Sequence, residues 1–328
     1  MNTALRLVLS LTLAAGLIAL LLHWSGTAPG EILAALRELD LSVYWTALGV
    51  QLLIYPLRAL RLRILLPREH SVSTARLLPI SAAHILAANV LPAKLGEASL
   101  VLYLRRVGSV PAANGLAVLL VSRVLDFATL TGTLGVACLV LGLGGVLPEE
   151  PWLTTLGLGL GLIALLLTWL ASRGDRIVSS ATGTLSLLHL DRTSLGTRLM
   201  SLAQRLREAL AAVDRRQLTL AGTLTLPIWF LVFTFYATLA RGLGITDLSF
   251  LETIFGSGLA ILANLAPVNG FAGFGVQDMG WAAGFTALGV TGAVATSTGL
   301  AAHLVYLFNI SVLGAVGHVL MGTRTPAE

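Results

Sequence analysis

The stretch LLPISAAHILAANVLPAKLGEASLVLYL, residues 77–104, lies between Arg76 and the pair Arg105–Arg106. It is long enough to cross a bilayer, because a spanning helix needs about 20 apolar residues. However, Pro92 and Gly96 interrupt it near its middle, and both residue types break helices. Whether this stretch crosses the membrane or turns back inside it decides the fold.

The composition of the whole chain is that of a membrane protein. The chain has 328 residues, of which 56% are hydrophobic and only 11% charged, and its mean hydropathy is +0.87. Soluble proteins carry about 25% charged residues, so a water-soluble enzyme is excluded. Abundant apolar residues exclude disorder, and a single cysteine, Cys138, excludes a disulfide scaffold. The net charge of +5 comes from 20 Arg and one Lys against 16 acidic residues; in a membrane protein the positions of such charges matter more than their sum, and we expect no nucleic-acid partner.

Six apolar segments are predicted to cross the membrane as helices. The first of them has Arg6 ahead of its apolar core, as a signal peptide has. Its core is longer than the usual length of about 7–15 residues, and no small-residue cleavage site follows, so we expect a retained helix. The six segments are 7–24, 41–57, 127–147 (extended backwards to about 116), 151–172, 218–240 and 299–321.

Basic residues set the orientation of these helices. Segment 58–76 carries five arginines, and segment 173–216 carries eight arginines against four acidic residues. The connections 25–42, 148–151 and 241–252 are net acidic. The positive-inside rule therefore places the two arginine-rich segments in the cytoplasm. The prediction is a multi-pass protein of the cell membrane with both termini cytoplasmic.

This orientation predicts that residues 77–104 enter and leave by the cytoplasmic face, because the next helix must run outward. The same reasoning applies at the outer face to residues 252–296. Non-helical backbone at membrane depth is tolerated only where protein buries it or water reaches it. We therefore predict an all-α, polytopic integral membrane protein of about six transmembrane helices plus two oppositely oriented re-entrant helical hairpins. The predicted hairpin breaks are Pro92 and Gly96 in the first and Pro267, Gly270, Gly273 and Gly275 in the second.

The two hairpins share a local sequence pattern. Residues 88–92 (ANVLP) match residues 263–267 (ANLAP) at an offset of 175. We interpret the match as an inverted repeat, from which many transporters build alternating access; the alternative is that Asn-x-x-Pro merely ends a helix in both places. The chain 1–328 is then one domain with halves at about 41–147 and 218–321. A cytoplasmic amphipathic linker at about 173–217 joins the halves, and a short outer helix is expected at about 31–40.

Charged residues at membrane depth need a partner or a function, because each costs about 2.5–3.5 kcal/mol at the bilayer centre. Lys94, the only lysine, lies in the first break, three residues before Glu97. The functional interpretation is that Lys94 binds an anionic headgroup near the broken helix. The alternative is a self-contained Lys94–Glu97 ion pair.

Further candidates lie outside the first break. Arg123 and Asp126 share one helix face and either bind phosphate or clamp the helix to the first hairpin. Asp278 has no basic residue near it in sequence, so we expect it to pair with Arg123, Lys94 or Arg61, or to take up a proton. The remaining candidates are Asn89 and Asn264, which bind substrate or satisfy helix backbone, and Arg61, which reaches inward from the cytoplasmic side.

The segments 89–97 (NVLPAKLGE), 122–126 (SRVLD) and 273–278 (GFGVQD) together resemble the flippase-like transmembrane domain of the lysylphosphatidylglycerol synthase family. The resemblance covers nearly the whole chain. It implies lipid translocation without aminoacylation, because the soluble synthase domain of full-length relatives would follow the membrane part and this sequence ends at Glu328. The chain departs from the family pattern at Asp278, where Glu is typical, and at Val268–Asn269, where Pro-Gly is commoner.

The leading hypothesis is a flippase or carrier for an anionic, phosphate-bearing lipid such as a phospholipid, a glycolipid or a polyprenyl-phosphate carrier. The first alternative is a non-transporting scaffold or regulatory partner of a lipid-modifying enzyme. A membrane-embedded lipid transferase is disfavoured, because neither a metal-binding acidic motif nor a nucleophile–base pair is evident. We expect no cofactor and no metal. The small-residue run 157–161 permits close helix contacts and leaves a homo-oligomer open.

Overall fold

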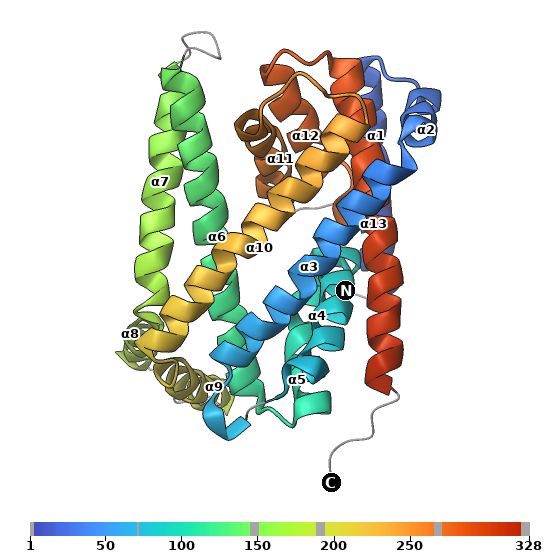
Figure 1. Cartoon of the computed structure of the whole chain (residues 1–328). Helices are drawn as coiled ribbons and strands as arrows, with labels where there is room; N and C mark the ends of the chain where they lie inside the picture. The colour runs from blue at the N-terminus through green and yellow to red at the C-terminus, as the bar shows by residue number, and fades with distance from the viewer. Residues whose placement is uncertain (1–2, 71, 145–150, 188–193, 266–270, 323–328) are drawn as a thin grey trace.

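The computed structural model describes residues 3–70, 72–144, 151–187, 194–265 and 271–322, and this part of the chain contains helices and no strands (Figure 1). The prediction of an all-α membrane protein is therefore confirmed. The elements are α1 (Thr3–Ser25), α2 (Pro29–Glu38), α3 (Leu41–Leu65), η1 (Arg68–His70), α4 (Thr74–Val90), η2 (Pro92–Ala98), α5 (Ser99–Gly108), α6 (Ala112–Leu143), α7 (Pro151–Ala171), α8 (Gly174–Leu187), α9 (Ser194–Ala211), α10 (Arg215–Gly242), α11 (Phe250–Asn264), η4 (Phe271–Gly273), α12 (Val276–Ala287) and α13 (Gly292–Gly322).

Four helices in the described part are long and apolar enough to cross a membrane, namely α6, α7, α10 and α13. Residues 11–25 of α1 and the helix α2 form a further apolar pair that is bent by 88°. The helix α3, predicted over 41–57, continues to Leu65 and carries Arg58, Arg61 and Arg63 in its C-terminal part. The helix α13 begins at Gly292 rather than near 299, because the turn before it is made at Gly289, whose φ is +89°.

Each predicted hairpin is a pair of helices joined by a break. The first consists of α4, η2 and α5, and the second of α11, η4 and α12. In Figure 1 the first hairpin lies in the lower half of the molecule and the second in the upper half. Two of the predicted break residues, Pro267 and Gly270, lie outside the described residues.

The two halves of the chain pack reciprocally. Helix α3 packs along α10, and the first arm of each hairpin packs on a long helix of the other half: α4 on α13, and α11 on α6. Helix α7 packs mainly on α6, where a Cβ at Gly135 would lie 3.0 Å from the carbonyl oxygen of Gly157. Small residues thus permit the close approach that helices in lipid use.

Helix starts are set by side chains that bind free backbone N–H groups. The Asp40 carboxylate accepts from the Ser42 N–H at 2.6 Å and caps α3. Hydrogen bonds from the Ser42 side chain and, to a smaller extent, from its backbone N–H hold the pKa of the exposed Asp40 carboxyl below its usual value. Capping boxes begin α10, at Asp214 with Gln217, and α11, at Ser249 with Glu252.

The arginine-rich segments lie at one end of the molecule. The ends of α3 and α5 and the helices α8 and α9 occupy the lower end in Figure 1. The Gln217 side chain donates to the Ile64 carbonyl at 2.8 Å, which ties the start of α10 to the end of α3. The expected outer helix appears as α2, and the predicted linker contains α8 and α9.

Helix α1 is part of the packed bundle. It contacts η4, α12 and α13, and a Cβ at Gly275 would overlap the side chain of Leu17. Helix α1 thus covers the second break.

Candidate functional site

The first break begins where α4 ends. The Leu91 N–H still bonds to the Ala87 carbonyl at 3.0 Å, but Pro92 has no N–H to continue the helix. The chain then turns through η2, where Lys94 adopts a left-handed φ of +57°. Gly96 lies so close to the end of α4 that a Cβ there would overlap the Ala87 carbonyl. The break is therefore folded tightly against its own hairpin, and only a glycine fits at 96.

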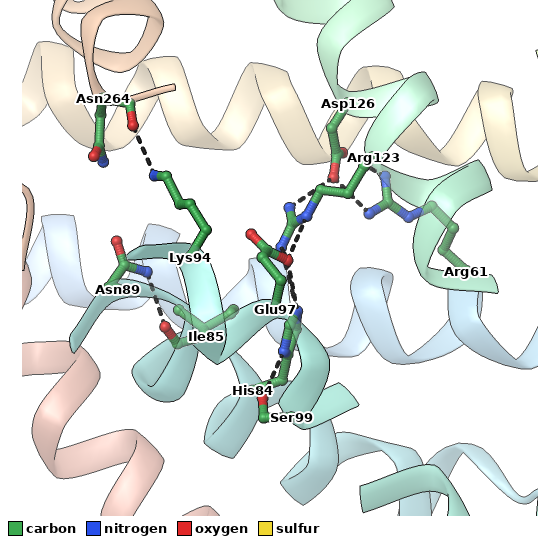
Figure 2. A network of polar contacts seen from close by, with 10 residues as sticks. All are labelled: Arg61, His84, Ile85, Asn89, Lys94, Glu97, Ser99, Arg123, Asp126 and Asn264. Atoms are coloured by element: carbon green, nitrogen blue, oxygen red, sulfur yellow. Dashed lines mark hydrogen bonds and ion pairs between the residues drawn. The ribbon is translucent and has the colours of Figure 1, made fainter. Parts of the chain in front are cut away.

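Lys94 connects the first break to the second hairpin. Its ammonium group donates to the carbonyl oxygen of Asn264 at 2.7 Å (Figure 2). Asn264 is the last residue of α11, and the C-terminal end of a helix carries partial negative charge that attracts cations. This contact joins segments 170 residues apart in sequence. The alternative of a self-contained Lys94–Glu97 pair is not what the structure has, because the two side chains point to different partners.

Glu97 instead bonds to the next helix. Its carboxylate accepts from the Nε and one terminal nitrogen of Arg123 at 2.8 and 2.7 Å. Another hydrogen bond joins Arg123 to Nε2 of His84 at 3.2 Å, and His84 Nδ1 lies 3.0 Å from the Ser99 hydroxyl. A guanidinium can only donate, so Nε2 accepts and the His84 proton lies on Nδ1. His84 is thus a neutral residue with both ring nitrogens hydrogen-bonded.

Asp126 and Arg61 form a buried ion pair. The two terminal nitrogens of Arg61 donate to the two Asp126 carboxylate oxygens at 2.6 and 3.1 Å, with 4% and 3% of the side chains exposed. Arg123, the Trp229 indole and Thr225 complete the network. The face of Arg123 and Asp126 points into the bundle, and Arg61 reaches inward as predicted. The pair joins α3, α6 and α10, which favours the clamp interpretation for Asp126.

Asp278 does not join this network. Its carboxylate contacts Nδ1 of His303 at 2.8 Å and accepts from the Gly275 N–H at 2.9 Å. The expectation of Arg123, Lys94 or Arg61 as its partner is therefore wrong. A count of lysine, arginine and acidic residues misses His303, which lies 25 residues further along the chain, on α13. The pair is 1% exposed on both sides and lies beneath the second break, where Gly273 and Gly275 have φ of +87° and +85°.

The two asparagines satisfy backbone and neighbouring amides. Asn89 donates to the Ile85 carbonyl of its own helix at 2.8 Å. The side-chain amide of Asn264 donates to the Gln277 amide oxygen at 2.9 Å, across the second break. Both contacts agree with a structural role for these side chains, although both residues also line the cavity described next.

A cavity of about 170 Å³ lies where the two hairpins meet. Most of the predicted binding residues line it, whereas Arg61 and Asp278 do not. The predicted residues that line it are Lys94, Glu97, Arg123, Asp126, Asn89 and Asn264.

Sequence reasoning missed several residues of the cavity wall. Gln51, Tyr55 and Arg58 follow one another at helical spacing on α3 and all face the cavity. This spacing is the signal that the sequence offers, but the positive-inside rule places Arg58 with segment 58–76 in the cytoplasm and so away from the cavity. The other missed polar and aromatic residues are Phe127, Trp229, Phe235, Tyr236, Gln277 and Tyr306.

The described residues contain no group of three or more His, Cys, Asp or Glu side chains placed to hold a metal ion. The cavity is thus a place where cations, amides and aromatic rings meet. Such a lining can bind an anion by direct hydrogen bonds from guanidinium and ammonium groups.

Comparison with known proteins identifies the family. Residues 7–314 match the model of the family described as "Lysylphosphatidylglycerol synthase TM region". Searches of curated proteins and of solved structures gave no match. The family match covers essentially all of the helical part of the chain, including both hairpins and the cavity between them. This chain therefore belongs to the lysylphosphatidylglycerol synthase transmembrane-region family.

Proposed function

We propose that this protein binds an anionic, phosphate-bearing lipid with its headgroup in the cavity and carries that headgroup across the membrane. The observation that carries the proposal is the position of Lys94: its ammonium lies in a cavity between two broken hairpins and contacts the end of the opposite one. A cation at such depth is costly without a partner. An anionic headgroup would supply that partner.

The cavity offers complementary groups for such a headgroup. Arg58 and Arg123 present planar guanidinium groups that can bind two phosphate oxygens at once. The aromatic and aliphatic wall suits the apolar part of the lipid next to the headgroup. Membership of a lipid-synthase membrane-region family supports a lipid as the ligand.

The reciprocal packing of the two halves supports transport by alternating access. Transporters built from inverted repeats bind substrate near the midplane and open alternately to each side. Here each hairpin packs on a long helix of the other half, and the Lys94–Asn264 bond joins the two breaks. We place both termini and the arginine-rich end of the molecule in the cytoplasm of a cell-membrane protein, following the positive-inside rule.

The proposal is tested in vesicles that contain the purified full chain and a trace of fluorescent phosphatidylglycerol, with dithionite to quench the label in the outer leaflet. Wild-type protein should expose the inner-leaflet label to quenching. Lys94→Met, which loses both the charge and the hydrogen bond, should slow exposure by about 10-fold or more, because a charged hydrogen bond contributes about 1.5–3 kcal/mol. Lys94→Gln keeps N–H donors for the Asn264 carbonyl but has no charge. Comparing it with Lys94→Met therefore distinguishes the effect of the hydrogen bond from the effect of the charge.

The matched control is Arg63→Gln. Arg63 lies on α3 with Arg58 and Arg61, but it is exposed and bonds to Thr74 at 3.3 Å away from the cavity. Its substitution should leave exposure of the label unchanged. If wild-type protein binds anionic lipid but leaves the inner label protected, transport is excluded and the scaffold or regulatory role takes its place. If it neither binds nor moves anionic lipid, the proposal fails altogether.

A further inference from the structure

The charged groups at the cavity do not compensate one another. Four cationic side chains lie in or next to the cavity wall, whereas the described residues that line it include two carboxylates. Both carboxylates are already bound: Glu97 by Arg123, and Asp126 by Arg61 together with Arg123. Among the described residues, two cations at the cavity are left without a carboxylate, and they are Arg58 and Lys94.

Arg58 is the less satisfied of the two. It lines the cavity, and it makes no ion pair with a carboxylate in the described part of the chain. Its Nε is buried and has no hydrogen-bond partner there. A buried donor without a partner is destabilising, and more so when the group is charged. The arrangement therefore favours a ligand that brings acceptor oxygens to Arg58.

Lys94 has spare donors as well. An ammonium carries three N–H donors, and the recorded bond to the Asn264 carbonyl uses one of them. That carbonyl is neutral, so it satisfies a donor without cancelling the charge. Lys94 and Arg58 reach the same cavity from η2 and from α3.

The nearby histidines do not change this balance. His84 accepts a hydrogen bond from Arg123 and is therefore neutral. His303 is held by Asp278 and the Ala272 carbonyl outside the cavity wall. The excess at the cavity is two positive charges in a region where an uncompensated charge is costly.

We infer that the cavity selects a terminal phosphate, that is, a phosphomonoester dianion, over a phosphodiester. This inference rests on the proposed function and names its substrate class. A phosphomonoester carries a charge of about −1.5 to −2 at pH 7 and three acceptor oxygens. It satisfies Arg58 and Lys94 together. A phosphodiester carries one negative charge and leaves one of the two cations without a counter-charge.

The test compares two lipids that differ by one methyl group and one ionisable oxygen: dioleoyl phosphatidic acid and dioleoyl phosphatidylmethanol. Binding of each to the purified full chain in phosphatidylcholine nanodiscs is measured by native mass spectrometry. Wild-type protein should prefer phosphatidic acid by about 10-fold or more, which corresponds to about 1.4 kcal/mol. Equal affinity for the two lipids overturns the inference.

Variants locate the source of the preference. Arg58→Gln and Lys94→Gln should each bring the two affinities within about 2-fold of each other while binding of phosphatidylmethanol persists, because the remaining excess charge matches a monoanion. Arg58→Lys keeps the charge and should keep most of the preference. Arg63→Gln, outside the cavity, should behave as wild type. A preference that survives Arg58→Gln and Lys94→Gln overturns the charge-matching argument.

Two further measurements distinguish failure of the monoester selectivity from failure of the proposed lipid-binding function. Inorganic phosphate in large excess should fail to displace phosphatidic acid; displacement overturns the lipid as the source of the phosphate and points to a soluble phosphate ester. If wild-type protein binds both anionic lipids equally but ignores phosphatidylcholine, the proposed function stands and the monoester selectivity falls. If no anionic lipid binds, both fall. Folding of each variant is checked through Cys138, which is free and buried and should therefore react with a maleimide dye only on unfolding.

Discussion

His303 Nδ1 lies 2.8 Å from Asp278 Oδ1, and the other ring nitrogen of His303 lies 3.1 Å from the carbonyl oxygen of Ala272. A carbonyl only accepts, and a neutral imidazole has one N–H to donate. Both contacts are hydrogen bonds only if the pair holds a second proton. The pair is then either an imidazolium beside a carboxylate or a neutral ring beside a protonated carboxyl, and in both cases it has no net charge.

Removing His303 should therefore destabilise the protein strongly. His303→Ala leaves the Asp278 carboxyl buried with the Gly275 N–H as its recorded partner, and breaking a buried pair in this way costs about 3–5 kcal/mol. The double variant Asp278→Asn/His303→Ala should recover part of the loss. The measurement is thermal unfolding in detergent, followed by dye labelling of Cys138. His23→Ala, on the exposed end of α1, is the control; an unchanged midpoint for His303→Ala would contradict the prediction.

The Arg61–Asp126 pair should behave as a structural clamp. Arg61→Met leaves Asp126 buried with Arg123 at 3.3 Å and Trp229 as partners, so we expect a loss of about 3–5 kcal/mol. Arg61→Met/Asp126→Leu removes both charges and should be more stable than the single variant. Denaturation with increasing detergent or urea measures the free energy of unfolding of the single and the double variant. Arg123→Gln, whose side chain is 25% exposed, should cost less; a larger loss there would assign the clamp to Arg123 instead.

Gly96→Ala should destabilise the first hairpin, because the added methyl group overlaps the Ala87 carbonyl and backbone cannot move away cheaply. Overpacking of this kind costs about 1–3 kcal/mol. Gly49→Ala is the matched control, since a Cβ at Gly49 on α3 meets nothing within 4 Å; it should be neutral or slightly stabilising. Midpoints of thermal unfolding compare the two. Equal midpoints would mean that η2 does not lie against α4 in solution.

Asp40 should give a small, pH-dependent contribution at the start of α3. Its folded pKa lies below the ordinary value of 3.8, because the Ser42 side chain and then the Ser42 N–H donate to the ionised carboxylate. The stabilisation is therefore fully present above 3.8 and is lost as the pH falls through the lower, folded pKa. Asp40→Ser, a cap without a carboxylate, should lack this loss. Unfolding midpoints of the two proteins should diverge on acidification; parallel curves would contradict the cap.

Much of the fold could be predicted from the sequence. Long uncharged segments predict α6, α7, α10 and α13 because lipid demands about 20 apolar residues per crossing. The break residues Pro92 and Gly96 located the first hairpin, since neither residue type continues a helix at low cost. Helix ends were harder to predict. Helix α3 runs past its predicted end at 57, because arginines extend a helix as readily as apolar residues do.

The candidate site could be predicted from the sequence only in part. Charges at unexpected depth pointed to Lys94, Glu97, Arg123 and Asp126, and all four line the cavity. The partners of these residues could not be predicted. Lys94, for example, bonds to Asn264, which is 170 residues away in sequence, and no local spacing indicates such a contact. The partner of Asp278 was missed because a histidine in an apolar helix carries no formal charge in a count of ionised residues.

The hydrogen bond between Lys94 and Asn264 also contributes to the equilibrium between joined and separated breaks. A charged hydrogen bond contributes about 1.5–3 kcal/mol net, so its loss changes the ratio of joined to separated molecules by about 10- to 160-fold. If this bond were the whole free-energy difference, the separated conformation would make up about 1–10% of molecules, a population that ligand binding can readily enlarge. An anion that takes over the Lys94 donors would replace the bond instead of opposing it. The population of the separated conformation would then rise with the fraction of molecules that have an anion bound in the cavity.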